Sequence, residues 1–467
     1  MPELLFHGAA REVTGSLHML HVDGRWVALD CGLFQGRRAE AEEKNRAWPM
    51  PPADIAAVVL SHAHMDHAGR LPRLVRDGFA GPIFCTPATR DLLAVMLADS
   101  AHVQEEDAHF ISKRRRKRGL PPIEPLYDYD DVLAALKLIQ SVSYDRWFPV
   151  VPGLLACFLD AGHMLGSAYV RLAFGKATDG SEANTLLYTG DVGKRDKPIL
   201  RDPAPFPADD TLICESTYGA RTSEPVEHAK ELMHAVIVRT LKRRGKVIVP
   251  SFAVGRTQTI VYTLHERMVA GRLPRIPVFI DSPLAVNATE VFKLHPECYD
   301  AEARAFHLVT GDILGNGCCT YVRTVDQSKA LNYRKEPCII IAGSGMIEAG
   351  RIRHHIHNTI EDERNTILIA GFQAAHTLGR RLADGARRIT LFHDELDVRA
   401  EVVQIHGFSG HADQPELLAL LAPQAHAARH LILVHGEQEQ VETLADKSRA
   451  LGYRDVRIGT RGERLAL

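Results

Sequence analysis

Short apolar runs bounded by polar residues dominate the first half of the chain and predict β-strands. Residues 16–22 and 25–30 flank Asp23-Gly24, a dipeptide typical of a tight hairpin turn. Residues 55–61 form an apolar run that is typical of a buried strand. Further strands are expected at 154–159, 168–174, 185–188 and 211–214. Mixed segments at about 86–111 and 127–138 predict helices.

The pattern changes after residue 223. Amphipathic segments at 226–243 and 258–271 predict helices, and they alternate with short apolar runs at 246–249, 278–280, 338–342 and 366–370. This alternation is typical of a mostly parallel α/β sheet. From about residue 401 the first pattern returns, with a strand at 431–434 and a helix that begins after Asp413. The order predicts an α/β domain inserted into a strand-rich domain.

Composition narrows the class of protein. A chain of 467 residues exceeds the usual size of a single core, so two domains are expected. A net charge of −2 argues against a uniformly basic protein that coats nucleic acid, although a local basic groove stays open. The eight cysteines form no CxxC pair, which argues against a thiolate zinc finger. Neither a signal peptide nor a membrane-spanning run is found, so we expect a cytoplasmic protein without membrane contact.

The run His62-Ala-His64-Met-Asp66-His67 directly follows the apolar strand predicted at 55–61. Three imidazoles and a carboxylate therefore lie in the loop at the end of a strand. One zinc ion needs three or four N, O or S ligands, so the run could supply two ligands to each of two adjacent metals. The alternative is a polar surface loop without a ligand.

Other groups that can bind a metal or transfer a proton occupy similar positions. Asp30, Asp191, Glu215 and His435 each follow a predicted strand, and His163 lies in a polar loop between two strands. Functional groups in open α/β sheets gather at the carboxyl ends of strands. Each residue alone could be a hydrogen-bonded structural residue, but their repeated placement predicts one shared site.

With these motifs the chain resembles the metallo-β-lactamase superfamily and, within it, the β-CASP group of ribonucleases, which includes the endonuclease subunit of mRNA 3′-end cleavage and polyadenylation. The resemblance covers essentially the whole chain. The matching motifs are His62–His67, His163, Asp191 in Tyr-Thr-Gly-Asp, Glu215 in Glu-Ser-Thr-Tyr-Gly, His411 in Phe-Ser-Gly-His-Ala-Asp, and His435 in Val-His-Gly-Glu. Segments 250–256, 281–284 and 343–346 also resemble β-CASP stretches.

The resemblance implies a fold as well as an activity. It implies a metallo-β-lactamase αββα sandwich into which an α/β β-CASP domain is inserted. The expected division places the sandwich at 1–217 and 399–467 and the insertion at 218–398. The insertion would cover the metal site and leave a cleft for a single strand.

The resemblance also implies roles at a site for two Zn²⁺ ions, with Mn²⁺ as the alternative metal. One metal would take His62, His64 and His163, the other Asp66, His67 and His435, and Asp191 would bridge them. Asp30 would hydrogen-bond a ligand histidine. The implied catalytic residues are Asp66, which would orient the attacking water, His411, which would protonate the leaving 3′ oxygen, and Glu215, which would hold His411.

The expected partner is single-stranded RNA. The resemblance and their loop positions suggest phosphate contacts at Ser251, Arg256, Ser344 and Gly345, although a Gly-Ser-Gly loop is often only a turn. The basic run Lys113–Arg118 is expected to be a flexible solvated loop, with contact to RNA as the alternative. A homodimer is an open alternative for the oligomeric state.

The predicted function is that of a zinc-dependent ribonuclease, mainly endonucleolytic, which uses water activated by two metals. The alternatives are a 5′-to-3′ exoribonuclease, a small-molecule metallohydrolase of the same superfamily, and a non-catalytic RNA-binding subunit. Only about thirty residues follow His435, which argues against the exonuclease branch with its C-terminal assembly domain. A non-catalytic subunit would typically lack metal ligands, and none of the expected ligands is missing here.

Overall fold

The structure is a computed structural model that describes residues 2–175, 184–315, 317–371, 373–374 and 376–467. The chain folds into two compact units. The first unit comprises Met1–Arg195, Asp202–Thr222 and His411–Leu467, and the second comprises Asp196–Arg201 and Ser223–Gly410. The boundaries expected at 217/218 and 398/399 stay a prediction.

The first unit contains two seven-stranded sheets. The order of the first sheet is β22 (Arg464–Ala466), β1 (Glu3–Gly8), β2 (Leu17–Val22), β3 (Arg25–Leu29), β4 (Ile55–Val59), β5 (Ile83–Cys85) and β6 (Ile139–Ser141). The order of the second is β21 (Val456–Ile458), β20 (His430–Val434), β11 (Thr211–Glu215), β10 (Asn184–Tyr188), β9 (Ala168–Phe174), β8 (Leu154–Asp160) and β7 (Trp147–Val151).

Alternating side chains make this unit a layered sandwich. In β11, Ile213 joins the core between the two sheets, while its neighbours Leu212 and Cys214 join the core on the opposite face of the second sheet. Two helices cover that opposite face, α13 (Gln414–Leu421) and α14 (Gln438–Ala450). The remaining helices are α1 (Arg38–Arg46), α2 (Met65–Ala68), α3 (Leu71–Arg76), α4 (Pro87–Arg116) and α5 (Tyr129–Lys137), with short 3₁₀ turns at Pro52–Asp54 and Ala422–Gln424. The αββα sandwich expected from the sequence is therefore present.

Most elements predicted for the first unit are confirmed. The hairpin is formed by β2 and β3, and both residues of its Asp23-Gly24 turn have positive φ angles. Asp413 caps α13 in a reciprocal capping box with Glu416. The basic run is a correction, because α4 continues as a helix to Arg116 instead of giving way to a loop at Lys113. Lysine and arginine are good helix formers, so the helix need not end before them.

The second unit is built on a six-stranded parallel sheet. Its order is β14 (Cys319–Tyr321), β13 (Val278–Asp281), β15 (Ile339–Ala342), β12 (Val247–Pro250), β16 (Thr366–Ile369) and β19 (Glu401–Gln404). The parallel α/β sheet predicted from the alternation is thus confirmed. A two-stranded hairpin of β17 (Arg388–Leu391) and β18 (Asp394–Asp397) completes the strands described in this unit.

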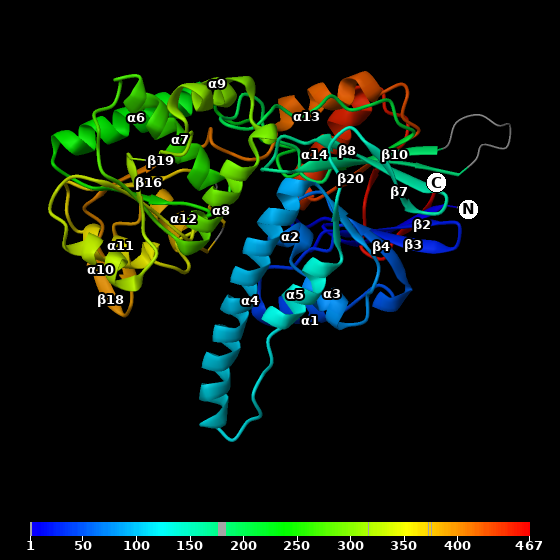
Figure 1. Cartoon of the computed structure of the whole chain (residues 1–467), viewed down its shortest axis with the longest axis horizontal. Coiled ribbons are helices and arrows are strands. Elements are labelled where there is room, and N and C mark those ends of the chain that lie inside the picture. The colour runs from blue at the N-terminus through cyan, green and yellow to red at the C-terminus, as the bar shows by residue number, and fades with distance from the viewer. Residues whose placement is uncertain (1, 176–183, 316, 372, 375) are drawn as a thin grey trace. The chain divides into compact units, whose positions relative to one another are not determined.

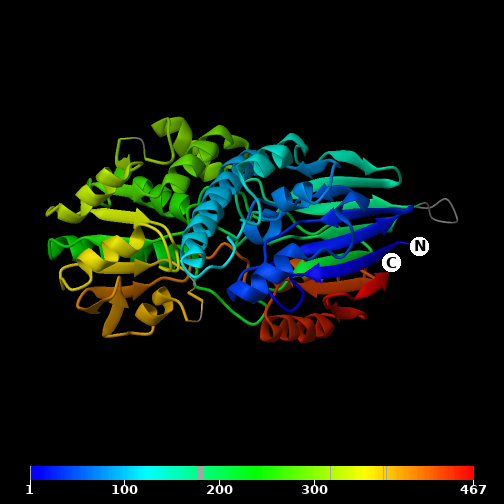
Figure 2. The same ribbon diagram turned by 90° about the horizontal axis from the view of Figure 1, so that it is seen from below.

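The helices of the second unit connect these parallel strands. They are α6 (Val226–Lys242), α7 (Arg256–Val269), α8 (Pro283–Leu294), α9 (Ala301–Thr310), α10 (Val325–Tyr333), α11 (Ile352–Thr359) and α12 (Leu378–Ala383), with a 3₁₀ turn at Pro296–Cys298. In Figures 1 and 2 this unit runs from green through yellow to light orange, and the first unit runs from blue to green and ends in deep orange and red. Within the described ranges, none of the helices has the length and apolarity needed to cross a bilayer.

Candidate metal centre

The first unit brings together every metal ligand expected from the sequence. The loop after β4 carries His62 and His64, and α2 carries Asp66 and His67. His163 lies between β8 and β9, Asp191 follows β10, and His435 follows β20. Strands β20, β11, β10, β9 and β8 are consecutive in the second sheet, which explains why residues so far apart in the chain meet at one edge.

The ligand atoms form two sets. The first consists of His62, His64, His163 and Asp191, and the second consists of Asp66, His67 and His435. Within each set the candidate ligand atoms lie within 4.8 Å of one another. The grouping matches the two three-residue sets implied by the family resemblance, with Asp191 next to the first.

Asp191 faces both sets with different oxygens. Its Oδ2 lies 3.5 Å from His62 Nε2 and 3.4 Å from His163 Nε2. Its Oδ1 lies 3.2 Å from His67 Nε2. A carboxylate with one oxygen toward each set has the geometry of a bridging ligand.

The residues present fit metal ions. His62 Nε2 and Asp191 Oδ1 are buried and have no hydrogen-bond partner among the described atoms. His67 Nε2 lies 3.0 Å from His435 Nε2, so these two ring nitrogens are close enough to face one cation. Imidazole nitrogen and carboxylate oxygen are zinc ligands in proteins.

Burial and neighbouring charges shift the pKa values of the candidate ligands in both directions. At His67 burial would lower the pKa, but the carboxylates of Asp191 and Asp30 outweigh it and raise the pKa well above its ordinary value. Burial and the neighbouring His62 lower the pKa of His64 to about 3, so its imidazole is neutral. Burial and the nearby His411 hold the pKa of His163 well below its ordinary value. At Asp191 burial would raise the pKa, but the surrounding histidines outweigh it and hold the pKa well below its usual range. Neutral imidazoles around ionised carboxylates attract a divalent cation.

Asp30 orients one of the candidate ligands. It is fully buried, and its Oδ2 accepts hydrogen bonds from His67 Nδ1 at 2.6 Å and from Tyr188 OH at 2.6 Å. Ser61 donates its backbone N–H to Asp30 Oδ1 at 2.7 Å. Because Nδ1 of His67 donates to Asp30, Nε2 is the ring nitrogen that is left to bind a metal. The expected hydrogen bond between Asp30 and a ligand histidine is present.

His411 and Glu215 lie beside the first ligand set. His411 Nδ1 is 3.1 Å from Glu215 Oε1, and His411 Nε2 is 3.9 Å from Asp191 Oδ2. Burial would lower the pKa of His411, but the carboxylates of Glu215 and Asp191 outweigh it and raise the pKa to about 9. His411 can therefore carry a proton at neutral pH with Nε2 directed at the site.

Glu215 also groups with Asp191 and His435 as a potential metal site, yet its oxygens are already in use. Oε1 accepts the Val192 N–H at 2.6 Å, and Oε2 accepts the Thr217 N–H at 3.2 Å. A carboxylate that already accepts these bonds and faces His411 is better suited to holding His411 than to binding a metal. We therefore infer that Glu215 holds His411 and does not bind a metal.

The four expected phosphate contacts lie in the second unit, at the carboxyl end of its parallel sheet. Ser251 follows β12, where its Oγ accepts from Thr257 Oγ1 at 3.0 Å. Ser344 and Gly345 follow β15, and a Cβ on Gly345 would lie only 2.8 Å from the Phe252 ring. Arg256 begins α7. Their roles as phosphate contacts stay a prediction.

Sequence reasoning did not single out three side chains that support the site. Ser61 Oγ hydrogen-bonds Asp30 and lies 2.9 Å from His62 Nδ1, Tyr188 hydrogen-bonds Asp30, and Thr217 Oγ1 lies 3.0 Å from His435 Nδ1. Tyr188 and Thr217 lie within the sequence motifs that contain Asp191 and Glu215. Their proximity to these residues in the sequence was the signal that could have identified them. Their partners depend on tertiary structure, which the sequence pattern does not give.

Three family models match the chain. The metallo-beta-lactamase superfamily matches residues 13–136, the Beta-Casp domain matches 257–382, and the Zn-dependent metallo-hydrolase RNA specificity domain matches 395–458. The first match contains His62 and His64 of one set and Asp66 and His67 of the other, and the third match contains His435. The match of the Beta-Casp domain lies within the second unit.

Curated relatives match over nearly the whole chain. Ribonuclease TTHA0252 from Thermus thermophilus is 36% identical over 457 residues, which cover 98% of each protein. Transcription termination factor FttA is 30% identical in Methanosarcina mazei and 32% identical in Methanocaldococcus jannaschii. These matches cover 97% and 96% of this chain and 69% and 68% of the two relatives.

A solved structure of a protein of unknown function from Enterococcus faecalis also resembles the chain. Its TM-score is 0.56, its sequence identity is 14%, and the match covers 100% of both chains. At this identity the likeness concerns the fold alone.

Proposed function

The chain belongs to the metallo-β-lactamase superfamily and, within it, to the β-CASP family, and from this membership we propose that it is a zinc-dependent endoribonuclease acting on single-stranded RNA. Its family and its ribonuclease relative together support the conclusion that the protein is a metal-dependent hydrolase of RNA. Zinc as the metal, two ions per chain and cleavage within the strand are the parts that we propose. A cytoplasmic location, as expected from the sequence, belongs to the same proposal.

The observation that carries the proposal is the position of Asp191 between two ligand sets. Oδ2 faces His62 and His163, and Oδ1 faces His67. Two metals held a few ångströms apart suit an in-line displacement at phosphorus. When bound, two Zn²⁺ ions would supply Lewis acidity toward the phosphodiester and make water more acidic.

The chain's own residues supply the proton chemistry. Asp66 is partly exposed, and its Oδ2 lies 3.5 Å from His435 Nε2, which leaves the carboxylate able to orient a water molecule at the site. His411 holds a proton on Nε2, on the side of Asp191, and delivers it to the leaving 3′ oxygen. Glu215 accepts from His411 Nδ1 and stabilises the charged imidazole.

The choice of RNA rests on the relatives and on the family model. The Thermus thermophilus relative is named a ribonuclease, and one matching model is described as an RNA specificity domain. In the proposal, Ser251, Arg256, Ser344 and Gly345 contact phosphates, since they lie at the carboxyl end of a parallel sheet where ligands commonly bind.

The test is the length of the products from a single-stranded RNA labelled at its 5′ end. Zinc-loaded wild-type protein should yield labelled internal fragments of several lengths. The Asp66→Ala variant should yield none, because it lacks a metal ligand and the group that orients water. Labelled mononucleotide alone would replace the proposal with 5′-to-3′ exonuclease activity. Failure of the metal-replete protein to cut RNA would point to a small-molecule ester or phosphodiester as the substrate.

A further inference from the structure

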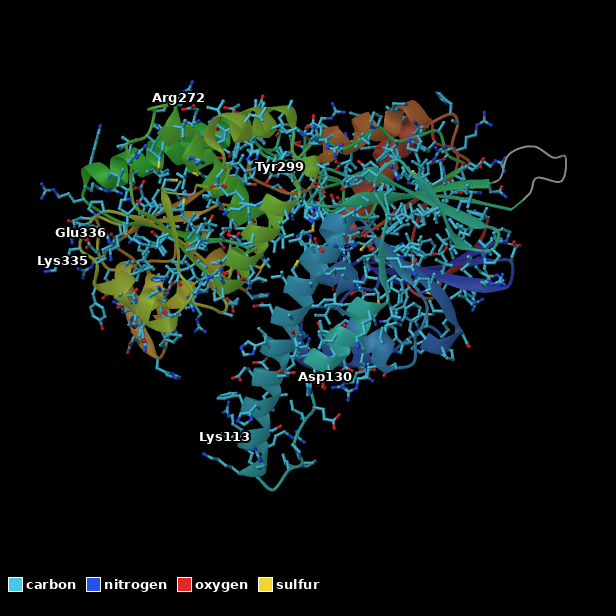
Figure 3. The ribbon with its side chains drawn as sticks, viewed as in Figure 1. Lys113, Asp130, Arg272, Tyr299, Lys335 and Glu336 are labelled. Atoms are coloured by element: carbon cyan, nitrogen blue, oxygen red, sulfur yellow. The ribbon has the colours of Figure 1, made fainter. Side chains whose placement is uncertain are left out.

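Six consecutive basic residues, Lys113–Arg118, lie in the last turn of α4 and in the turn that follows it, and we call them the basic arm. Helix α4 is 30 residues long, and its apolar burial is concentrated in its first half. Beyond Ala101 only Ala108 and Ser112 are buried among the described residues of this helix. Figures 1 and 3 show the helix extending past α5, with Lys113 near its tip. The arm therefore projects from the first unit.

The other end of α4 is anchored at the metal centre. Thr86 and Thr89 donate their hydroxyls to the carbonyl oxygen of Gly166 at 2.6 Å and 2.8 Å. Gly166 belongs to the loop that carries the ligand His163. Since an α-helix rises 1.5 Å per residue, about 40 Å of helix separate Pro87 from Lys113. One rigid element thus joins the metal centre to a distant basic surface.

The returning chain holds the arm in place. Ser112 Oγ donates to the Ile123 carbonyl at 3.2 Å and accepts the Ile123 N–H at 2.9 Å. Arg115 Nε donates to the Pro121 carbonyl at 2.6 Å. A surface ordered in advance loses little conformational entropy when it binds a ligand.

The charge of the arm is not neutralised within the described residues. Asp107 pairs with Arg38 at 3.8 Å, Glu124 pairs with Arg76 at 3.4 Å, and no described acidic side chain forms an ion pair with residues 113–118. Cations near a helix carboxyl end interact favourably with the helix dipole, but like charges three and four residues apart repel. Six adjacent cations exceed what the dipole stabilises, and a polyanion would relieve their repulsion.

An exposed aromatic ring accompanies the charges. Phe110 is 59% exposed, and the Arg114 guanidinium lies 5.7 Å from its ring centre. Leu120, on the returning chain, is 46% exposed. Unpaired bases stack on aromatic rings while their phosphates contact Lys and Arg. The combination favours a single-stranded nucleic acid over a duplex or an acidic protein.

We propose that the basic arm binds the phosphates and a base of the same RNA strand that is cut at the metal centre. The inference rests on the proposed function, because it identifies a second binding surface for that substrate. Its consequence is a preference for length. An RNA long enough to reach from the metal centre to Lys113 gains affinity from the arm, and a tetranucleotide does not.

The test compares zinc-loaded wild-type protein with two variants that lose the same charge. The arm variant carries Lys113→Gln, Arg116→Gln, Lys117→Gln and Arg118→Gln, which keeps good helix formers and spares Arg114 and Arg115. The control variant carries Gln at four exposed, dispersed positions of the same unit, Arg25, Arg146, Lys447 and Arg454. The substrates are an unstructured long polyuridylate and tetrauridylate.

We expect the arm variant to lose about tenfold in kcat/KM on polyuridylate at moderate salt and to cut tetrauridylate at the wild-type rate. The slope of log affinity for polyuridylate against log salt should fall by about 0.7 for each phosphate that the arm no longer neutralises. The control variant should match the wild type on both substrates. The inference is overturned if the arm variant and the control variant behave alike on polyuridylate.

Binding of polyuridylate, followed by fluorescence anisotropy, separates this inference from the proposed function. If the wild type cuts neither RNA, the proposed function fails. An RNA-binding arm would still be supported if the arm variant, but not the control variant, binds polyuridylate more weakly than the wild type. Equal binding by both variants would reject the arm as well. Loss of polyglutamate binding with polyuridylate binding intact would reject RNA and identify an acidic protein segment as the ligand.

Discussion

Asp30 accepts four hydrogen bonds, from Ser61 N and Oγ, from His67 Nδ1 and from Tyr188 OH, although it is fully buried. A carboxylate can accept all of them, whereas an amide has only one oxygen and would turn two N–H donors into the same pocket. Burial would raise the pKa of Asp30, but the hydrogen bond to His67 and the charges of His67 and His62 outweigh it and lower the pKa. Asp30 is therefore ionised, and its negative charge lies next to the candidate metal ligands.

We predict that Asp30→Asn weakens metal binding by about 10- to 100-fold, because His67 loses the acceptor that fixes its ring. Competition with a zinc chelator measures the change. Asp23→Asn is the matched control, since Asp23 lies in the exposed hairpin turn and asparagine tolerates its positive φ. Unchanged affinity in Asp30→Asn would show that Asp30 does not support a metal ligand.

His411→Ala should lower the rate of RNA cleavage by about 10²- to 10⁴-fold, the usual range for loss of a general acid. Its zinc content should not change, since His411 belongs to neither ligand set. Single-turnover cleavage and metal analysis on the same sample test both statements. His426→Ala, at an exposed histidine of the same unit, should have no effect. Loss of zinc together with activity would instead make His411 a ligand.

Sequence predicted the residues of the site better than their surroundings. The candidate ligands were recognisable because most of them lie just after an apolar run and because the order of the motifs resembles a known family. The contact of Thr217 with His435 depends on the pairing of β11 with β20, and that of Ser61 with Asp30 depends on the pairing of β3 with β4. No spacing rule within the chain encodes such contacts.

At the scale of elements, a buried polar network joins β13, α10 and α11 in the second unit. Asp281, at the end of β13, accepts from Ser328 Oγ at 2.5 Å, His355 Nε2 at 2.7 Å and Arg351 Nη1 at 2.6 Å. Asn332 Oδ1 lies 2.9 Å from the other ring nitrogen of His355. One carboxylate thus ties two helices to the carboxyl end of a strand.

This network predicts an acid-sensitive contribution to stability. Burial would raise the pKa of Asp281, but its hydrogen bonds from His355, Ser328 and Arg351 outweigh it and lower the pKa in the folded state. A carboxylate with a lowered folded pKa stabilises the fold above its unfolded pKa of about 3.9, and the contribution is lost as the pH falls through the folded pKa. Asp281→Asn should therefore be less stable at pH 7, and the gap to wild type should narrow below about pH 4.

Urea unfolding of both proteins across that pH range measures the gap. Asp326→Asn, at an exposed position of α10, is the control and should follow the wild type at every pH. A gap that stays constant or widens on acidification would contradict the assigned ionised state of Asp281.

Elements with a clear hydrophobic periodicity were predictable from the sequence, whereas short or charge-rich elements were not. The β2–β3 hairpin and the parallel strands β12, β13, β15 and β16 follow from apolar runs and turn residues. Strands of three residues, such as β5, β6 and β21, are too short to show an alternation. The expected loop at Lys113 was wrong because contacts with Ile123 and Pro121 support the helix there.

At the scale of the whole molecule, fold class followed from the succession of patterns along the chain. A strand-rich first part, an alternating middle and a strand-rich end indicated an inserted α/β unit, and both kinds of sheet are present. The net charge of −2 gave no hint of the basic arm, because acidic residues elsewhere balance it. Composition averages over a surface on which charge is unevenly placed.

Metal removal should destabilise the molecule. Buried His62 Nε2 and Asp191 Oδ1 have no hydrogen-bond partner among the described atoms, so a bound cation would satisfy both. A ligand at a thousand times its Kd stabilises the folded state by about 4 kcal/mol. A chelator should therefore lower the melting temperature of the zinc-loaded protein, and restored zinc should reverse the shift. Equal melting temperatures with and without chelator would contradict a buried metal centre.

The most direct test of the central claim is a zinc titration of metal-free protein, with the rate of polyuridylate cleavage as the readout. A site bridged by Asp191 predicts that the rate rises until about two zinc ions are bound per chain, and that Asp191→Asn never reaches the wild-type plateau. Full activity without zinc, or a plateau at one ion per chain, would contradict the two-metal account.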